Sequence, residues 1–205
     1  SSVVQLPVDS YFQDAPSQTV VFVPSPSAVT HFGTHIGLFD PFDSKLYRRE
    51  GSEIRVSIGP GDGKMLEMCG TLPQEVSLNS ILSNKSVIKG AVNILPGINV
   101  ETNSGTTTRI LSNSVINIGD GASYTLRGIV TIEDSVSIVV SQNGSLIFDN
   151  AICTLGQGSF IEVNGGSLSI ESSSLDRSSS ATRWNGLTVT NSNVVTIIDA
   201  TISNA

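Results

Sequence analysis

The side chains best suited to chemistry in this 205-residue chain are carboxyl groups in its second half. They are Asp120, Glu133, Asp134, Asp149, Glu162 and Glu171. A glycosidase needs two carboxyl groups flanking one bond, one as acid and the other as base or nucleophile. Glu133 and Asp149 are sixteen positions apart, and Glu162 lies thirteen beyond Asp149, spacings that fit neighbouring turns of a repeating structure. These three are the candidate catalytic residues, and the default interpretation is that they are solvated surface charges.

Lyase chemistry would instead need a calcium-binding carboxylate cluster with an arginine or lysine as base. The arginines available for this role are Arg109, Arg127, Arg177 and Arg183. None of them lies in a recognisable lyase motif, so the sequence assigns no catalytic residue outright.

A serine-rich segment is the candidate ligand-binding site. Serines at 172–174 and 178–180 flank Leu175-Asp176-Arg177, and Trp184 follows shortly after. Loops of this composition commonly carry recognition, so Asp176, Arg177 and Trp184 are the candidate binding residues. An exposed Trp184 would stack on a sugar ring, whereas a buried one would fill the core beside a strand.

Two other motifs are weaker. His31 and His35 have the spacing of metal ligands on a helix, with Asp40 and Asp43 close by, but Gly33 and Gly37 interrupt the segment and there is no HExxH motif. The run from Gly59 to Met65 resembles a phosphate loop, but it has three rather than four residues before its Gly-Lys, and Met replaces the required Ser or Thr. We therefore predict no metal and no cofactor.

Composition limits the possible partners. Only 14% of residues are charged and the net charge is −7, so nucleic acid, which needs clustered Lys and Arg, is excluded as a partner. No apolar run is long enough to span a membrane. Two cysteines, Cys69 and Cys153, could form a disulfide or remain as free buried thiols.

The composition of the sequence changes near residue 70, and the secondary structure expected to position these residues changes with it. Prolines, aromatic residues and both histidines concentrate in 1–69, which predicts a β-rich cap or small domain with strands at 19–23 and 53–58. Residues 70–205 instead repeat short Val, Ile and Leu runs separated by Gly or Asn. Such short strands favour a solenoid over a sandwich, so the fold class predicted is all-β, with a right-handed parallel β-helix after the N-terminal cap.

The last part of the chain resembles a known family. Trp184-Asn185-Gly186-Leu187-Thr188-Val189, Asn193-Val194-Val195-Thr196-Ile197 and Ala200-Thr201-Ile202-Ser203-Asn204 look like coils of right-handed parallel β-helix (pectate-lyase-like) proteins. They are especially similar to large secreted surface proteins of Bacteroidota-type bacteria. The resemblance covers roughly residues 90–205 and implies an extracellular setting with an adhesive or carbohydrate-facing role.

Residues 203–205 stop in the middle of the repeat, so we expect a C-terminal continuation or a partner to cover the last coil. The leading hypothesis is a non-enzymatic, extracellular structural or adhesive segment of a larger surface or secreted protein, with polysaccharide or other surface proteins as partners. One alternative is a β-helix that binds or cleaves polysaccharide, as a lyase or tailspike-like depolymerase does. A virion or injection-machine fibre, which predicts a trimer, is the other.

Overall fold

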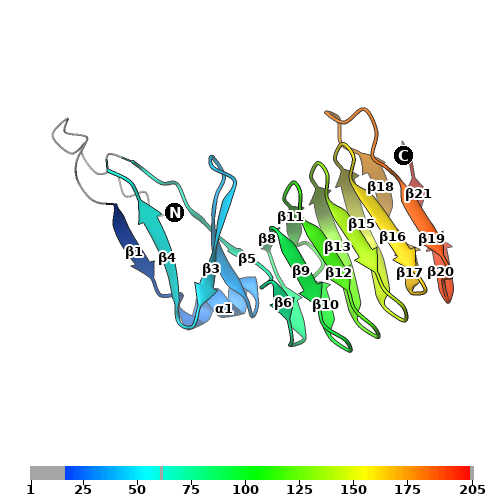
Figure 1. The fold of residues 1–205 in the computed structure, drawn as a ribbon, viewed down its shortest axis with the longest axis horizontal. Helices are drawn as coiled ribbons and strands as arrows, with labels where there is room; N and C mark the ends of the chain where they lie inside the picture. Colours follow the sequence, from blue (N-terminus) through cyan, green and yellow to red (C-terminus); the bar gives the residue numbers. More distant parts are fainter. Residues whose placement is uncertain (1–16, 61, 204–205) are drawn as a thin grey trace.

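The structure, a computed structural model, describes residues 17–60 and 62–203. Strands make up 55% of it and the described residues contain one short helix, so the predicted all-β class is confirmed. The residues after Gly70 wind into a parallel β-solenoid of about 5 turns. Figure 1 shows the coils stacked along the long axis, beyond a group of antiparallel strands at the N-terminal end.

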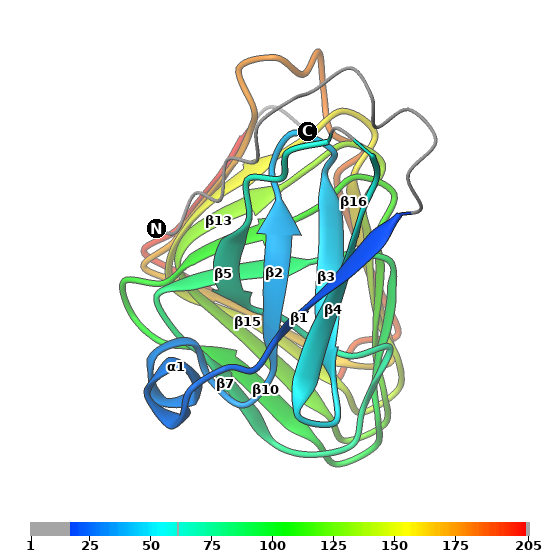
Figure 2. The same ribbon diagram turned by 90° about the vertical axis from the view of Figure 1, so that its left-hand side faces the viewer.

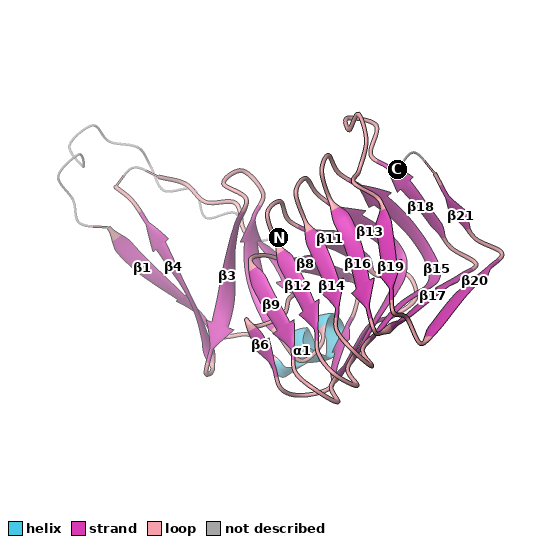
Figure 3. Ribbon diagram, turned by 45° about the vertical axis from the view of Figure 1, so that its right-hand side comes forward, coloured by secondary structure: helices cyan, strands magenta, loops and turns pink. Residues whose placement is uncertain are grey.

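Each coil contributes strands to three faces. Face 1 consists of β6 (Glu75–Val76), β9 (Ala91–Ile94), β12 (Val115–Ile118), β14 (Ser137–Val140), β16 (Phe160–Asn164) and β19 (Leu187–Thr190). Face 2 consists of β7 (Ser80–Leu82), β10 (Asn99–Thr102), the first parts of β13 (Ser123–Ile132) and β15 (Ser145–Leu155), β17 (Ser167–Glu171) and β20 (Val194–Ile198). Face 3 consists of β8 (Lys85–Ile88), β11 (Thr107–Ile110), the second parts of β13 and β15, β18 (Ser174–Arg177) and β21 (Thr201–Ile202). Neighbouring coils pair in parallel on every face (Figure 3).

Residues with positive φ make the corners between faces. Between face 2 and face 3, φ is 75° at Gly128, 52° at Asn150 and 48° at Ser172. Glycine takes this left-handed conformation without strain, and asparagine tolerates it better than most residues. Gly128 also needs to lack a side chain, because a Cβ there would lie 2.4 Å from the carbonyl oxygen of Thr106. The Gly and Asn residues that separate the apolar runs in the sequence are therefore the residues that form the corners between faces.

Inward-facing side chains stack in files through successive coils. Ile88, Ile110, Ile132 and Leu155 occupy the same register position on face 3, and each is at most 2% exposed. Burying one such side chain stabilises the fold by about 1.5 to 3 kcal/mol. Because the side chains of a strand alternate in direction, the residues between these buried positions face solvent and are mostly polar.

The N-terminal part, which we call the cap (residues 17–60 and 62–70), is an antiparallel sheet that continues into face 3. Its strands, in chain order, are β1 (Gln18–Phe22), β2 (Ile36–Asp40), β3 (Lys45–Glu50), β4 (Glu53–Ile58) and β5 (Glu67–Gly70). They lie in the order β1-β4-β3-β2-β5, and β5 then pairs in parallel with β8 through Gly70 and Ser86. The boundary predicted between residues 69 and 70 falls inside β5.

The helix α1 (Pro26–Phe32) also belongs to the cap. Ser25 caps its N-terminus by accepting a hydrogen bond from the Ala28 amide, and Pro26 suits the first helical turn. The helix ends at Gly33, where a Cβ would lie 2.0 Å from the carbonyl oxygen of Ile81. Only glycine therefore allows α1 to end this close to β7, and Figure 2 shows α1 beside β7 and β10.

On the last described coil, inward-facing apolar side chains are about half exposed to solvent. Val195 and Ile197 lie in register with the buried Leu168 and Ile170, yet they are 49% and 51% exposed. Among the described residues, no further strand pairs with the outer edge of β20.

Candidate functional site

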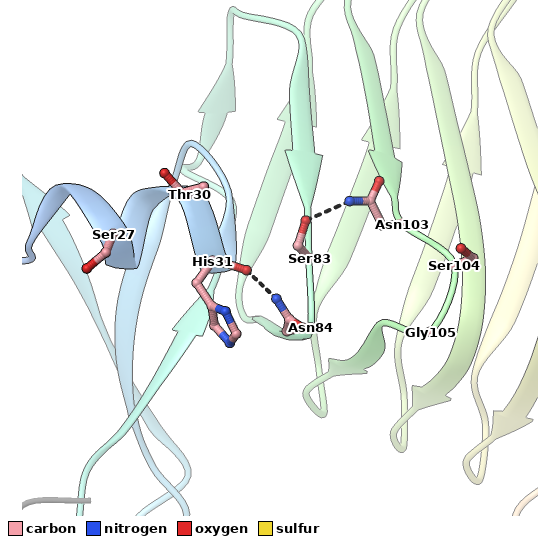
Figure 4. Close-up of a pocket in the computed structure, with 8 residues that line it drawn as sticks. All are labelled: Ser27, Thr30, His31, Ser83, Asn84, Asn103, Ser104 and Gly105. Carbon is pink, nitrogen blue, oxygen red and sulfur yellow. Dashed lines mark hydrogen bonds between the residues drawn. The ribbon is translucent and has the colours of Figure 1, made fainter.

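Two adjoining hollows lie where α1 meets face 2. The larger has a volume of about 830 Å³ and lies between the end of α1 and the outward surface of β7, β10 and β13. The smaller, of about 510 Å³, lies against the corners that follow β7 and β10 (Figure 4). Thr30, Ser83 and Asn103 line both hollows, so we treat them as one site, the α1 groove. Its other lining residues are Ser27, Val29, His31, Gly33, Thr34, Asn79, Ser80, Ile81, Asn84, Asn99, Val100, Glu101, Ser104, Gly105, Ser123 and Thr125.

Hydrogen bonds fix α1 against the first corner of the solenoid. The Ser83 amide donates to the Phe32 carbonyl oxygen over 3.3 Å, and the Asn84 side-chain amide donates to the His31 carbonyl oxygen. A bridge between Gly33 and Leu82 adds a third connection. These bonds use the helix C-terminal carbonyl groups, which lack partners within the helix, so the wall of the groove is held in place.

A ladder of uncharged polar side chains forms the floor of the groove. The Asn99 backbone N–H donates to Asn79 Oδ1 over 2.8 Å, and the Ser123 hydroxyl donates to Asn99 Oδ1 over 2.7 Å. At the next corner, Asn103 Nδ2 donates to Ser83 Oγ over 2.8 Å, as Figure 4 shows. Neighbouring strands lie about 4.8 Å apart, so the groove offers hydroxyl and amide groups at the spacing of the coils.

At the edge of the groove, Arg127 forms ion pairs with two carboxylates, those of Glu101 and Asp149. Arg127 Nη1 lies 2.9 Å from Glu101 Oε2 and Arg127 Nε lies 2.8 Å from Asp149 Oδ2. The hydrogen bonds from Arg127 and then from Asn150 lower the pKa of Asp149 below its usual value. A general acid at neutral pH needs a raised pKa, so Asp149 is suited to holding Arg127 rather than to protonating a leaving group.

Glu133, the second candidate catalytic residue, lies at the corner between face 3 and face 1. Burial opposes its ionisation, but hydrogen bonds from Arg109 and from the Ser112 amide outweigh burial and lower its pKa. The Ser112 hydroxyl also donates to Glu133 Oε2 over 3.1 Å. The carboxylate therefore ties two consecutive coils together.

Glu162, the third candidate, points outward from the middle of β16 on face 1, between Val139 and Thr188 of the neighbouring strands. Asp149 lies at the corner between face 2 and face 3, and Glu133 lies at the corner between face 3 and face 1 of the preceding coil. The three carboxyl groups thus lie at three different places around the coil, and the structure does not bring them together across one substrate bond.

The candidate binding residues around Trp184 lie at the opposite end of the solenoid from α1. The Trp184 ring is fully buried in the core, and its indole N–H donates to the Ser203 carbonyl oxygen over 3.2 Å. Arg177 donates to the Ala181 carbonyl oxygen within its own loop, and its amide donates to Asp176 Oδ1. The loop is therefore anchored from inside by Trp184, whose ring does not reach the surface.

The histidines and acids of the cap form no metal site. In the described part of the chain, no three His, Cys, Asp or Glu side chains are grouped to hold a metal ion. The ammonium group of Lys64 pairs with the carboxylates of both Asp40 and Asp43. Lys64, the lysine of the predicted turn, thus ties that turn to the β2–β3 connection.

Both cysteines are free and buried. Burial raises the pKa of Cys69 to about 12 and raises the pKa of Cys153 as well. Of the two alternatives that the sequence left open, the structure shows free thiols.

Comparisons with protein-family models, with characterised proteins and with solved structures find no match to this chain. No helix among the described residues is long and apolar enough to cross a membrane.

Proposed function

We propose that this chain is a non-catalytic, extracellular structural and adhesive β-solenoid segment of a larger surface or secreted protein, and that it attaches to polysaccharide. The observation that carries the proposal is the α1 groove, an open site lined mostly by Asn, Ser and Thr side chains. The extracellular setting rests on the Ser-, Thr- and Asn-rich composition and on the resemblance of the last coils to pectate-lyase-like and Bacteroidota-type surface proteins.

The structural part of the proposal rests on the solenoid core. Buried apolar side chains form one continuous cluster from Leu72 to Trp184. Each coil in a solenoid packs only on its neighbours, so stacking produces a stiff rod. The half-exposed Val195 and Ile197 on the last coil are where further chain or a partner protein would pack.

The carboxylates favour binding over cleavage. Asp149 and Glu133 both have lowered pKa values and are bonded to Arg127 and Arg109. Hydrolysis would need one carboxyl group that keeps its proton and a second group across the bond. A polysaccharide-cleaving β-helix remains the competing function, because Glu101 and Arg127 lie at the edge of the groove.

Incubation of the protein with a panel of neutral, acidic and cationic polysaccharides tests the proposal. Retention of the protein and the release of new reducing ends are measured on the same samples. We expect retention without new chain ends. Cleavage would replace the adhesive function with an enzymatic one, and absence of retention from every polysaccharide would leave only the structural role. Light scattering separates a monomeric rod from a trimeric fibre.

A further inference from the structure

The α1 groove has a chemistry that selects among polysaccharides. We propose that it binds an uncharged polysaccharide, with the sugar chain lying across β7, β10 and the start of β13. This inference rests on the proposed adhesive function, and it names the site and the class of ligand.

The floor of the groove matches a chain of hydroxyl groups. Asn79, Asn99 and Ser123 come from three consecutive coils and are joined by hydrogen bonds of 2.8 and 2.7 Å. Amide and hydroxyl side chains both donate and accept hydrogen bonds, as sugar hydroxyl groups do. Since each coil adds a similar set of groups, a polymer that crosses the strands would meet the same chemistry repeatedly.

The groove also contains exposed apolar surface. Ile81 projects from β7 into the groove and is 46% exposed, and Val29 of α1, which also packs on the cap core, lines the same hollow. The faces of a sugar ring carry C–H groups, which gain free energy when they leave water for apolar surface. The volume of about 830 Å³ is within the usual range for a small-molecule site, but the lining is more polar than is usual for one, which suits a ligand covered with hydroxyl groups.

Charge determines the class of polysaccharide. Apart from His31, the only ionisable residue that lines the described groove is Glu101, and Arg127 is bonded to it. Arg127 is shared with Asp149, so the groove offers no unpaired cation to an acidic sugar. The chain carries a net charge of −7, which further disfavours an acidic polymer. An uncharged polysaccharide needs no cationic partner in the groove and is not repelled by the net negative charge of the protein.

The test measures the affinity of the full chain for soluble polysaccharides. Hydroxyethylcellulose and galactomannan are the neutral probes, alginate the acidic one and chitosan oligosaccharide the cationic one. Two groove variants are compared: Ile81→Ala, which removes the apolar contact, and Asn99→Arg, which adds bulk and charge to the floor. Their matched controls, Ile152→Ala and Thr107→Arg, change exposed outward positions on face 3.

We expect at least one neutral probe to bind more tightly than alginate or chitosan. Ile81→Ala should weaken that binding about fivefold and Asn99→Arg more than about tenfold, while the controls remain within about twofold. Circular dichroism and melting curves verify that each variant is folded. If Asn99→Arg does not fold, the smaller substitution Ile81→Ala decides the result.

The failures can be told apart. Groove variants that bind like their controls, or a wild-type protein that prefers a charged probe, would overturn this inference and leave the adhesive function standing. A wild-type protein retained by no polysaccharide would overturn both.

Discussion

The cap and the solenoid are built from the same kind of element but are held together differently. The solenoid has one continuous core, whose inward side chains repeat at the same register position in every coil. The cap has a smaller core around Ile36, Leu38 and Ile54, and its antiparallel strands do not repeat. The solenoid therefore gains stability from repetition, whereas the cap depends on a few contacts and on its attachment to the first coil.

The difference also separates the roles of the two parts. The solenoid supplies a polar floor at a regular spacing, and α1 of the cap supplies the wall that turns this floor into a groove. Neither part forms the site alone. We therefore expect substitutions in the two parts to differ in how much they lower the free energy of unfolding, in how far the loss of hydrogen-exchange protection spreads, and in their dependence on pH.

The largest effect should come from the solenoid core. Phe148 is fully buried, so Phe148→Ala should lower the free energy of unfolding by about 3 to 5 kcal/mol, measured by denaturant titration. Phe160→Ala is the matched control, because Phe160 points outward from face 1 and is 37% exposed. It should cost less than about 1 kcal/mol. Equal losses would contradict the inward and outward assignment of these strands.

A smaller and more local effect is expected in the cap. Ile54 is fully buried in the cap core, and Ile54→Ala should cost about 2 to 4 kcal/mol. Hydrogen exchange should accelerate in β2, β3 and β4 and remain slow in β12 to β16, because the solenoid coils pack on one another. Val21→Ala, at a 47% exposed position in β1, is the control. Simultaneous loss of protection in both parts would show that they unfold as one unit.

The fold could be read from the sequence where it repeats. The Gly and Asn residues that separate the apolar runs include the Asn-Gly pairs at 143–144 and 164–165, and these pairs lie at corners between face 1 and face 2. The run 53–58 predicted a strand, and it is β4. At the corners, turn residues decide the conformation because the same corner recurs in successive coils, and in β4 the alternation of buried and outward side chains decides it.

The candidate site could not be predicted in the same way. The helix α1 has only seven residues, too few for a helical period, although Ser25-Pro26 is a capping signal that was available. The groove depends on Gly33 meeting Ile81 and on Asn79 meeting Asn99, which are contacts between segments distant in sequence. A sequence pattern identifies Trp184 as a large aromatic residue beside a strand, but only the structure shows that the ring is buried.

Acid should destabilise the solenoid through Glu133. Its folded pKa is lowered, so its contribution is present above the unfolded value of about 4.3 and is lost as the pH falls through the folded value. Glu133→Gln should cost about 1 kcal/mol at pH 7 and flatten the dependence of stability on pH below about 4. Glu162→Gln, at an outward position of the same solenoid, is the matched control for the loss of one carboxylate. Urea titrations at several pH values make this comparison.

The smallest effect should appear in the cap at milder pH. Burial lowers the pKa of His35, and its Nε2 atom is buried without a hydrogen-bond partner. The unfolded state therefore takes up a proton first as the pH falls through about 6.5, and the cap should lose about 0.5 kcal/mol between pH 7.5 and 5.5. His35→Leu should remove this dependence, while His31→Gln, at an exposed position, should keep it. Hydrogen exchange in β2 reports the change. An identical pH dependence in His35→Leu and wild type would assign the effect to another group.

Hydrogen exchange of the whole chain, with and without the best-retained polysaccharide, tests whether the α1 groove is the binding site. We expect the polysaccharide to slow exchange in residues 79–83 and 99–103 and at the end of α1, and to leave the outward surface of face 3 unchanged. Protection confined to face 3 or to residues 174–186, or no protection at a saturating concentration, would contradict the assignment of the α1 groove as the binding site.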